Sequence, residues 1–488
     1  MTDHGPTAGT LQRRADLALV AVAVLFLALQ LAWVPRPFGL STDEATYLAK
    51  VDPRAPELNW TAPRAWGMPV LAAPVALFSA SVEVVRTYMS VLASLLLLAA
   101  FRPWVRVLHP AVAPVAALVF STIWFTLQAG VSVMPNLYVA LGSVGAIGLY
   151  LRAVQQPSWW RLLLTALAAC LVALVRPTDS VLTLGPLVLC ALLVPRLRRL
   201  APLAAGTAGV LAGWSPWVVE AFLRFGDPVQ RMTSAESVGP GGTSLRIANL
   251  LIYPRLLDGR PLYCCNRGAI TDAGPVPWID TAWLLAVVAL VAAGLLVAAR
   301  RRLLPEVLPC AGAAVLVSGF YLLLPAFTSL RFLLPALALA SISVALALVS
   351  AVPRAPGHVR TVAAALVALA LLGHLGLMLP TAHHQLQTAG EGREPQIRAA
   401  AALRLLVQDR PCLVVGTEKQ VTAYYLGCRV VGAHPTARPP SRVREAERDG
   451  RVIVAVLPGR PPEGYLSSWQ RYEVDGLPGR WRAYVPPR

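Results

Sequence analysis

The sequence predicts a polytopic α-helical membrane protein of about eleven transmembrane helices, followed by a small extracytoplasmic α/β domain. Three observations predict this fold class. Of the 488 residues, 56% are hydrophobic and 14% are charged, whereas soluble domains carry about 25% charged residues. Apolar runs recur as far as Pro380, and arginines gather in every second loop between them.

The apolar runs set the number of predicted transmembrane helices, because crossing the hydrocarbon core takes about 20 residues. The runs are Leu17–Val34, Val84–Phe101, Ala111–Leu127, Leu137–Leu151, Leu162–Val175, Val181–Val194, Leu203–Leu223, Ala282–Ala299, Leu303–Leu324, Phe332–Val352 and Val362–Leu379. The first run follows Arg13 and Arg14 and lacks an obvious small-residue cleavage site, which is typical of an uncleaved signal anchor. We therefore expect a multi-pass protein of the plasma membrane, with residues 17–380 as its transmembrane domain.

Arginine predicts the orientation, because cytoplasmic loops of membrane proteins are enriched in Lys and Arg. With residues 1–16 in the cytoplasm, every short cytoplasmic loop carries at least two arginines. They are Arg13 and Arg14; Arg102 and Arg106; Arg152 and Arg161; Arg196, Arg198 and Arg199; Arg300, Arg301 and Arg302; Arg354 and Arg360. The loops 35–83 and 224–280 and the tail 381–488 then lie outside.

Met68–Phe78 is the one apolar stretch that would upset this alternation if it crossed the membrane. It has about eleven residues, with Pro69 and Pro74 inside, which is too short for a span. We expect a helix at the outer surface.

Composition excludes some classes of function. The net charge of +18 would suggest nucleic acid in a soluble protein, but aromatic residues do not interleave the basic patches. We assign the arginines to membrane orientation and to anionic membrane lipids, with no nucleic-acid partner. Ionisable residues in the runs are few and lie near the ends (Arg86, Glu220 and His374), which argues against an ion-coupled transporter.

The tail alternates between helical and strand patterns, which predicts a small α/β domain. The expected helices are Glu394–Gln408, Val421–Leu426 and Ser441–Asp449, the last of which could instead be a solvated loop; the expected strands are Cys412–Gly416, Arg429–Gly432, Arg451–Leu457 and Trp481–Val485.

Two of the seven cysteines, Cys412 and Cys428, start predicted strands. Outside the cytoplasm they are a disulfide candidate if the strands are parallel neighbours, and otherwise they are two buried thiols. Cys170, Cys190 and Cys310 are expected to be packing residues. The sequence assigns no role to Cys264 and Cys265. No Cys/His spacing indicates zinc, and His383-His384 reads as a polar juxtamembrane turn.

Asp43 and Glu44 are adjacent carboxylates in the first outer loop, about ten residues beyond the first apolar run. Because Ser41 precedes Glu44 by three residues, the pair can simply be the start of a capped helix. The alternative is a functional carboxylate pair. Other polar residues that the topology places on the outer face are Asn136, Arg176, Asp179 and Arg331. Interfacial snorkelling can also explain Arg331, and helix capping is the favoured explanation for Asp179.

The membrane region, roughly residues 10–380, resembles the GT-C fold glycosyltransferases, which include protein O-mannosyltransferases and the lipid A aminoarabinose transferase. Asp43-Glu44 matches the Asp or Asp-Glu pair of their first extracytoplasmic loop by position and type. The turn Met134-Pro135-Asn136 is similar to the turn before their fourth span. Arg331-Phe332-Leu333-Leu334-Pro335 resembles an Arg-Phe-x-x-Pro element. Arg331 lacks the His-Lys-Glu that precedes this arginine in one branch, and no further acidic motif completes a metal site.

The resemblance implies transfer of a hexosyl or pentosyl unit from a polyprenyl-phosphate donor to an acceptor hydroxyl at the outer face. Asp43 and Glu44 would be the catalytic carboxylates, with Asp43 taking the acceptor's proton. Arg331 and Arg176 would bind the donor phosphate, and Asn136 and Asp179 would line the site. Glu44 is open to three roles, namely metal ligand, orienting group or helix cap, so a divalent metal ion stays possible. Weaker candidates for the phosphate are Arg255, Arg260 and Arg267.

Two alternatives stay open. A lipid or polysaccharide transporter predicts internal repeats and a continuous polar path, and neither is evident. A non-catalytic membrane scaffold would present the tail to a partner. The sequence predicts neither the sugar nor the acceptor.

Overall fold

The computed structural model describes residues 8–56, 58–238, 242–259, 276–325, 328–353, 357–408, 410–416, 419–432, 438–459, 461–477, 479 and 481–487. The chain divides into two compact units. The first unit comprises Met1–Ala32, Thr61–Gly67 and Ser90–Gln385, and the second comprises Trp33–Trp60, Met68–Met89 and Leu386–Arg488. The predicted domain boundary at residue 381 lies inside one continuous helix, α18 (His358–Val407).

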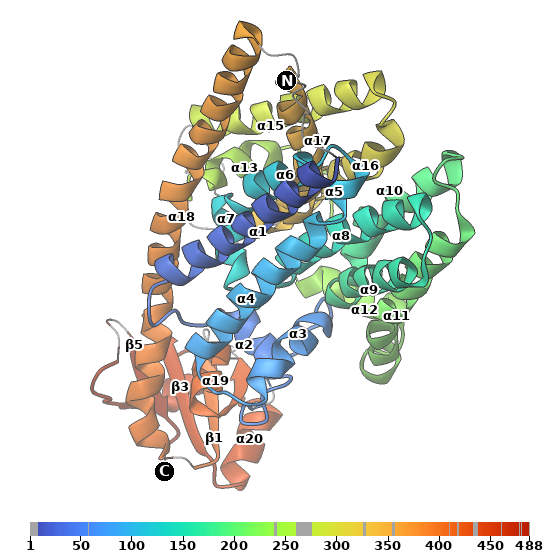
Figure 1. Cartoon of the computed structure of the whole chain (residues 1–488). Helices are drawn as coiled ribbons and strands as arrows, with labels where there is room; N and C mark the ends of the chain where they lie inside the picture. Colours follow the sequence, from blue (N-terminus) through green and yellow to red (C-terminus); the bar gives the residue numbers. More distant parts are fainter. Residues whose placement is uncertain are drawn as a thin grey trace. The chain divides into compact units, whose positions relative to one another are not determined.

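The regular elements of the first unit are helices throughout its described residues, apart from one isolated β-bridge between Thr243 and Pro325. Its elements, some shared with the second unit, are α1 (Ala8–Trp33), α4 (Val82–Phe101), α5 (Trp104–Val107), α6 (Val112–Ser121), α7 (Trp124–Gly130), α8 (Pro135–Gln155), α9 (Trp159–Val175), α10 (Pro177–Leu193), α11 (Leu200–Arg224), α12 (Pro228–Val238), α13 (Asn249–Leu257), α15 (Trp278–Arg300), α16 (Leu304–Leu323), η1 (Leu330–Leu333), α17 (Leu334–Ala351) and α18 (Figure 1).

Helices occupy the predicted apolar runs, which confirms a polytopic helical membrane protein. Within the described residues, seven helices are long and apolar enough to cross a membrane, and an eighth span results if α6 and α7 are counted as one. The apolar helices α9 and α10 have 17 residues each and are shorter than a full span. The count of eleven therefore stays a prediction.

The predicted run Ala111–Leu127 is not one straight helix, because α6 and α7 meet at an angle of 83°. The hydroxyl of Thr122 donates back to the carbonyl of Leu118 at 2.7 Å, and Ile123 takes an extended conformation. A side chain that bonds its own preceding turn competes with the helix and bends it. Apolar composition alone did not reveal this break.

Burial separates the inner from the outer helices of the first unit. The apolar windows of α8 and α17 are 83% and 89% buried, whereas those of α15 and α18 are 11% and 6% buried. Large apolar side chains exposed on the outer helices suit contact with lipid tails rather than with water.

Glycines allow α11 to approach α9 closely. A Cβ atom at Gly209 would lie 2.1 Å from the carbonyl oxygen of Ala166, and one at Gly213 would lie 2.5 Å from that of Cys170. This four-residue spacing of small residues is typical of helix pairs packed inside membranes.

We expect Gly209→Ala to destabilise the protein by about 1–3 kcal/mol, because the added methyl group overpacks a backbone contact. Gly206→Ala is the matched control, since its Cβ would meet no atom closer than 4.0 Å and the substitution improves helix propensity. Thermal unfolding in detergent checks the prediction, and equal melting temperatures for the two variants would contradict it.

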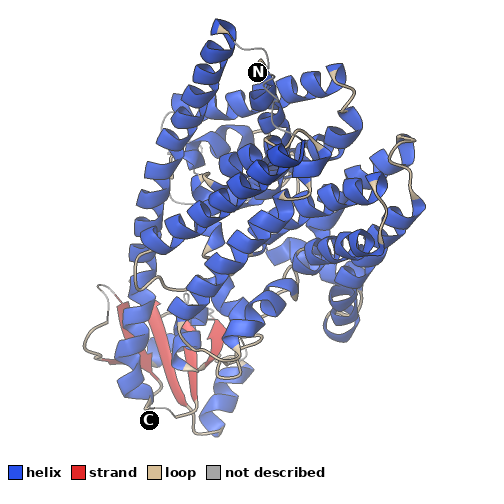
Figure 2. Ribbon diagram, in the orientation of Figure 1, coloured by secondary structure: helices blue, strands red, loops and turns tan. Residues whose placement is uncertain are grey.

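The second unit contains a five-stranded sheet of order β2-β1-β3-β5-β4. Its strands are drawn in red in Figure 2. The strands are β1 (Cys412–Gly416), β2 (Arg429–Gly432), β3 (Val452–Pro458), β4 (Gln470–Tyr472) and β5 (Trp481–Val485). β1 is parallel to β2 and β3, and β5 is antiparallel to β3 and β4. The four predicted strands are present. β4 was missed because its three residues are all exposed and show no apolar pattern.

Further helices complete the second unit. They are α2 (Thr42–Leu48), α3 (Gly67–Ala76), α19 (Lys419–Leu426), α20 (Ser441–Arg448) and the short η2 (Gly464–Ser468). The sheet, α20 and η2 contribute to an apolar core that includes Leu413, Val415, Val443, Ile453, Leu457, Leu466 and Trp469. The predicted short helix at 68–78 is present as α3, with 10 residues.

Candidate functional site

α2 begins with a side-chain cap and contains both carboxylates of the first loop. The Ser41 hydroxyl accepts a hydrogen bond from the amide of Glu44 at 3.4 Å, and a Glu44 carboxylate oxygen accepts one from the amide of Ser41 at 2.9 Å. This reciprocal pair is a capping box. The simpler of the two sequence interpretations, a capped helix start, is therefore confirmed for Glu44.

Glu44 is also the centre of a buried ion pair network. Its side chain is fully buried and contacts the guanidinium of Arg86, which is 5% exposed. Arg393 of α18 lies 3.3 Å from the other carboxylate oxygen. Burial alone would raise the pKa of Glu44, but the charges of the two arginines and the hydrogen bonds from Arg86 and Ser41 outweigh it. The pKa of Glu44 therefore lies well below its ordinary value.

This environment does not suit Glu44 to proton transfer or to metal binding. A carboxylate whose pKa lies well below its ordinary value is a weak base and therefore a poor proton acceptor, and the oxygens of Glu44 contact arginines and a backbone amide instead of a metal ion. Within the described residues, no three His, Cys, Asp or Glu side chains gather as metal ligands would. The residues described here do not fit a metal, so we assign Glu44 a structural role.

The two arginines fix the chain on both sides of Ser41. Arg86 donates to the carbonyl of Gly39 at 2.7 Å, and Arg393 donates to the same oxygen at 3.0 Å. Both guanidinium groups lie over the ring of Phe38, at 5.0 and 4.4 Å from its centroid. Sequence reasoning missed Arg393, because nothing local links it to a loop some 350 residues earlier.

Asp43 lies in the first turn of the same helix and differs from its neighbour in exposure. Glu44 is fully buried, whereas Asp43 is partly exposed. Successive residues on a helix point about 100° apart, so the network that buries Glu44 leaves Asp43 at the surface of the second unit. Asp43 is thus the more exposed carboxylate of the pair.

A second cluster, in the first unit, brings together three of the predicted residues. The Arg176 Nε atom lies 3.3 Å from a carboxylate oxygen of Asp179. The Tyr321 hydroxyl donates to the other oxygen of Asp179 at 2.5 Å. The guanidinium groups of Arg176 and Arg331 lie 5.1 and 5.5 Å from the ring of Phe332, which stacks on Tyr321. We call these five residues the arginine cluster.

The favoured sequence explanation of Asp179 as a helix cap is wrong. The N-cap of α10 is Arg176, which makes no side-chain capping bond, and Asp179 is buried within the first turn. Its carboxylate instead holds Tyr321 of α16 and Arg176. No sequence pattern singled out Tyr321, because it lies near the end of the mostly apolar helix α16.

Asn136 lies in the first turn of α8 and is 1% exposed. Its side-chain nitrogen makes no hydrogen bond within the described part of the chain. η1, which carries Arg331, packs against α7 and α8. A buried amide without a partner is uncommon in native structures, and this one supports a site-lining role.

The remaining candidates add little to the site. Arg255 bonds the carbonyl of Leu251 in its own helix, α13. Arg260, Arg267, Cys264 and Cys265 lie outside the described residues. His383 and His384 lie within α18 rather than in a turn. Asp43 and the arginine cluster belong to different units, so their convergence on one site stays a prediction.

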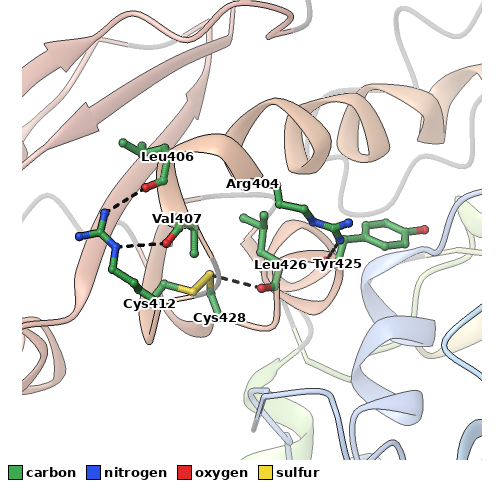
Figure 3. The surroundings of a disulfide bond; sticks show 8 residues. Arg404, Leu406, Val407, Cys412, Tyr425, Leu426 and Cys428 are labelled. Atoms are coloured by element: carbon green, nitrogen blue, oxygen red, sulfur yellow. Dashed lines mark hydrogen bonds between the residues drawn. A yellow bond between two sulfur atoms is a disulfide. The ribbon is translucent and has the colours of Figure 1, made fainter.

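Cys412 and Cys428 form a disulfide at the start of β1 and just before β2 (Figure 3). The two strands are parallel neighbours, with Leu413 paired to Arg429, which is the condition that the sequence set for this bond. Of the cysteines that the structure describes, Cys170, Cys190 and Cys310 are free thiols.

Known proteins with a similar structure exist, but none with a matching sequence was found among the family models or the curated proteins. The chain is similar in structure to ArnT from Cupriavidus metallidurans bound to undecaprenyl phosphate, with a TM-score of 0.61 and 14% identity over 97% of this chain and 99% of that chain.

Two archaeal structures are also similar. The oligosaccharyltransferase AglB from Archaeoglobus fulgidus, in complex with an inhibitory peptide and a dolichol-phosphate, has a TM-score of 0.51 and 14% identity over 90% of this chain and 69% of its own. A complex of the same organism's oligosaccharyltransferase with Zn and sulfate has a TM-score of 0.52 and 13% identity over 96% and 73%. The chain therefore has the GT-C fold that these membrane glycosyltransferases share.

Proposed function

We propose that the protein is a membrane glycosyltransferase that moves a sugar from a polyprenyl-phosphate donor to an acceptor hydroxyl outside the cytoplasm. One observation carries the proposal: the chain matches ArnT bound to undecaprenyl phosphate over almost the whole length of both. The partly exposed carboxylate of Asp43 and the clustered arginines Arg176 and Arg331 support it. The arginine pattern of the loops supports a cytoplasmic N-terminus and an extracytoplasmic tail.

The proposed reaction divides between the two groups of residues. The acceptor oxygen forms a bond to the anomeric carbon of the sugar while the bond from that carbon to the phosphate oxygen breaks. Asp43 takes the acceptor's proton. The leaving polyprenyl phosphate gains negative charge, which Arg176 and Arg331 stabilise. No step is assigned to a metal ion.

Asp179 and Tyr321 hold Arg176 in position in this mechanism. The ion pair with Asp179 fixes Arg176 from one side, and the stacked rings of Tyr321 and Phe332 support its guanidinium group from another. An arginine held in this way loses little side-chain entropy when it binds phosphate. Asn136 would line the same site.

Consumption of the donor tests the proposed function. Purified protein in nanodiscs is incubated with a panel of polyprenyl-phosphate sugars and candidate acceptors, and released polyprenyl phosphate is measured. We expect release with a lipid-linked donor and none with the corresponding nucleotide sugar. Failure of a folded protein to consume any lipid-linked donor would overturn the proposal.

We expect Arg176→Ala and Arg331→Ala each to lower kcat/KM for the donor by about 10- to 100-fold. A charge-assisted hydrogen bond contributes about 1.5–3 kcal/mol, and tenfold corresponds to about 1.4 kcal/mol. Arg300→Ala is the matched control, because Arg300 is exposed at the far end of α15. Initial rates over a range of donor concentrations check the prediction. An unchanged kcat/KM in both variants would exclude the arginine cluster as the phosphate site.

A further inference from the structure

α19 of the C-terminal sheet holds the chain on both sides of Asp43. The Tyr425 hydroxyl accepts a hydrogen bond from the amide of Leu40 at 2.9 Å. On the other side, the Thr46 hydroxyl donates to the side-chain oxygen of Gln420 at 2.7 Å, in a buried contact. α2 and α19 pack against each other, as Figure 1 also shows.

A third hydrogen bond from α19 fixes the turn that follows α2. The Tyr424 hydroxyl donates to a carboxylate oxygen of Asp52 at 2.9 Å. The other oxygen of Asp52 accepts from Arg54 at 2.7 Å, and Arg54 in turn donates to the carbonyl of Ala76 at 2.6 Å. These bonds tie the loop after α2 both to α19 and to the end of α3.

α19 is itself fastened at its C-terminal end. The Cys412–Cys428 disulfide joins the strands that lead into and out of it. Arg404, near the end of α18, donates to the carbonyl of Tyr425 at 3.0 Å. In Figure 3 the Tyr425 ring points away from the disulfide, so the backbone of this residue is held on one side while its side chain is available on the other.

α2 needs such outside support. It has seven residues, and isolated helices shorter than about 12 residues are marginal in water. Its capping box holds the first turn, which contains Asp43, in helical form but does not fix the place of that turn relative to other elements. Contacts with other elements must therefore decide where the Asp43 carboxylate lies.

We propose that α19 positions α2 and the residues just before it, with Tyr425 and Gln420 as positioning residues that set the location of Asp43. The Cys412–Cys428 disulfide keeps α19 in place. This inference rests on the proposed function in so far as Asp43 is the base. The tail is then part of the catalytic apparatus rather than a separate attachment.

Tyr425→Phe tests the inference with the removal of one hydroxyl. We expect kcat for sugar transfer to fall about tenfold while KM for the donor changes less than twofold, because small displacements of a reacting group cost rate. The Leu40 amide should exchange its hydrogen at least tenfold faster. Tyr472→Phe is the matched control, since Tyr472 lies on β4 of the same sheet and is exposed.

The disulfide provides a second, independent comparison. Reductant is expected to lower kcat of the wild type several-fold and to speed hydrogen exchange across residues 40–48. The double variant Cys412→Ala/Cys428→Ala should show both effects without reductant and should not respond to it. This control distinguishes the effect of breaking the Cys412–Cys428 disulfide from any effect of reductant on other cysteines.

The two readouts distinguish failure of this inference from failure of the proposed function. Unchanged exchange at Leu40 in Tyr425→Phe, or faster exchange with an unchanged kcat, would overturn the positioning role. If the wild type transfers no sugar, the proposed function fails and Asp43 loses its assigned role. The exchange data then still decide whether α19 holds α2. Faster exchange together with lower kcat supports the inference.

Discussion

Replacing Asp43 with Asn is expected to lower kcat for sugar transfer by about 10²- to 10⁴-fold, the usual contribution of a general base. The amide is nearly the same size as the carboxylate and keeps its place in the first turn of α2, but it cannot take the acceptor's proton. KM for the donor should change little, because the donor phosphate is assigned to the arginine cluster. Single-turnover release of polyprenyl phosphate measures the effect.

Asp475→Asn is the control for this experiment, since Asp475 is an exposed aspartate of the same unit. It should transfer sugar at the wild-type rate. The melting temperature of Asp43→Asn should also match the wild type, because Asp43 is partly exposed rather than buried. Wild-type turnover in Asp43→Asn would show that another group takes the proton.

Glu44→Gln should have the largest effect on stability, a loss of about 3–5 kcal/mol, which is the cost of removing one partner from a buried ion pair. The substitution would leave Arg86, at 5% exposure, without the carboxylate that it contacts. The capping bond to the Ser41 amide would also weaken. Unfolding of the purified protein in detergent measures the loss.

The pH dependence of this loss follows from the direction of the pKa shift. The pKa of Glu44 is lower in the folded protein than in the unfolded chain, so its contribution is complete above about pH 4.3, the ordinary glutamate value. The contribution is lost as the pH falls through the folded pKa. The stability difference between wild type and Glu44→Gln should therefore be constant from pH 7 to about 4.5 and should narrow below it.

Glu83→Gln is the matched control, because Glu83 is exposed at the start of α4 and surface charges contribute little. It should unfold like the wild type at every pH. A Glu44→Gln variant as stable as the wild type at pH 7 would contradict the ion pair network.

Sequence patterns predicted the features that depend on residues close together in the chain, such as strands and helix caps. Arg429–Gly432 and Trp481–Val485 are strands with the predicted bounds, because short β-branched and aromatic runs suit a pleated, buried surface. The capping box was visible at Ser41 and Glu44, because its two partners are three residues apart. The strand pattern likewise placed Cys412 and Cys428 at the starts of two strands, and the parallel pairing that a disulfide between them required is present.

The parts that could not be predicted depend on contacts between distant segments. The sequence left Glu44 open as a metal ligand, an orienting group or a helix cap, and it carried no sign that Arg393 lies beside it. Asp179 looked like a cap because its partner Tyr321 comes from a helix far along the chain. Single-sequence patterns do not encode such pairs, since a lone arginine or tyrosine near a helix end has many possible partners.

The bond between Leu40 and Tyr425 spans 385 residues, and this separation constrains the order of assembly during synthesis. At about 5–20 residues per second, the segment that carries Asp43 waits roughly 20–80 seconds for α19. Glu44 and Arg86 can pair early, but Arg393, Gln420 and Tyr425 emerge last. A nascent or truncated chain thus exposes its first loop without the groups that lock it. If α19 positions Asp43 as proposed, activity begins only after the tail has been synthesised and folded.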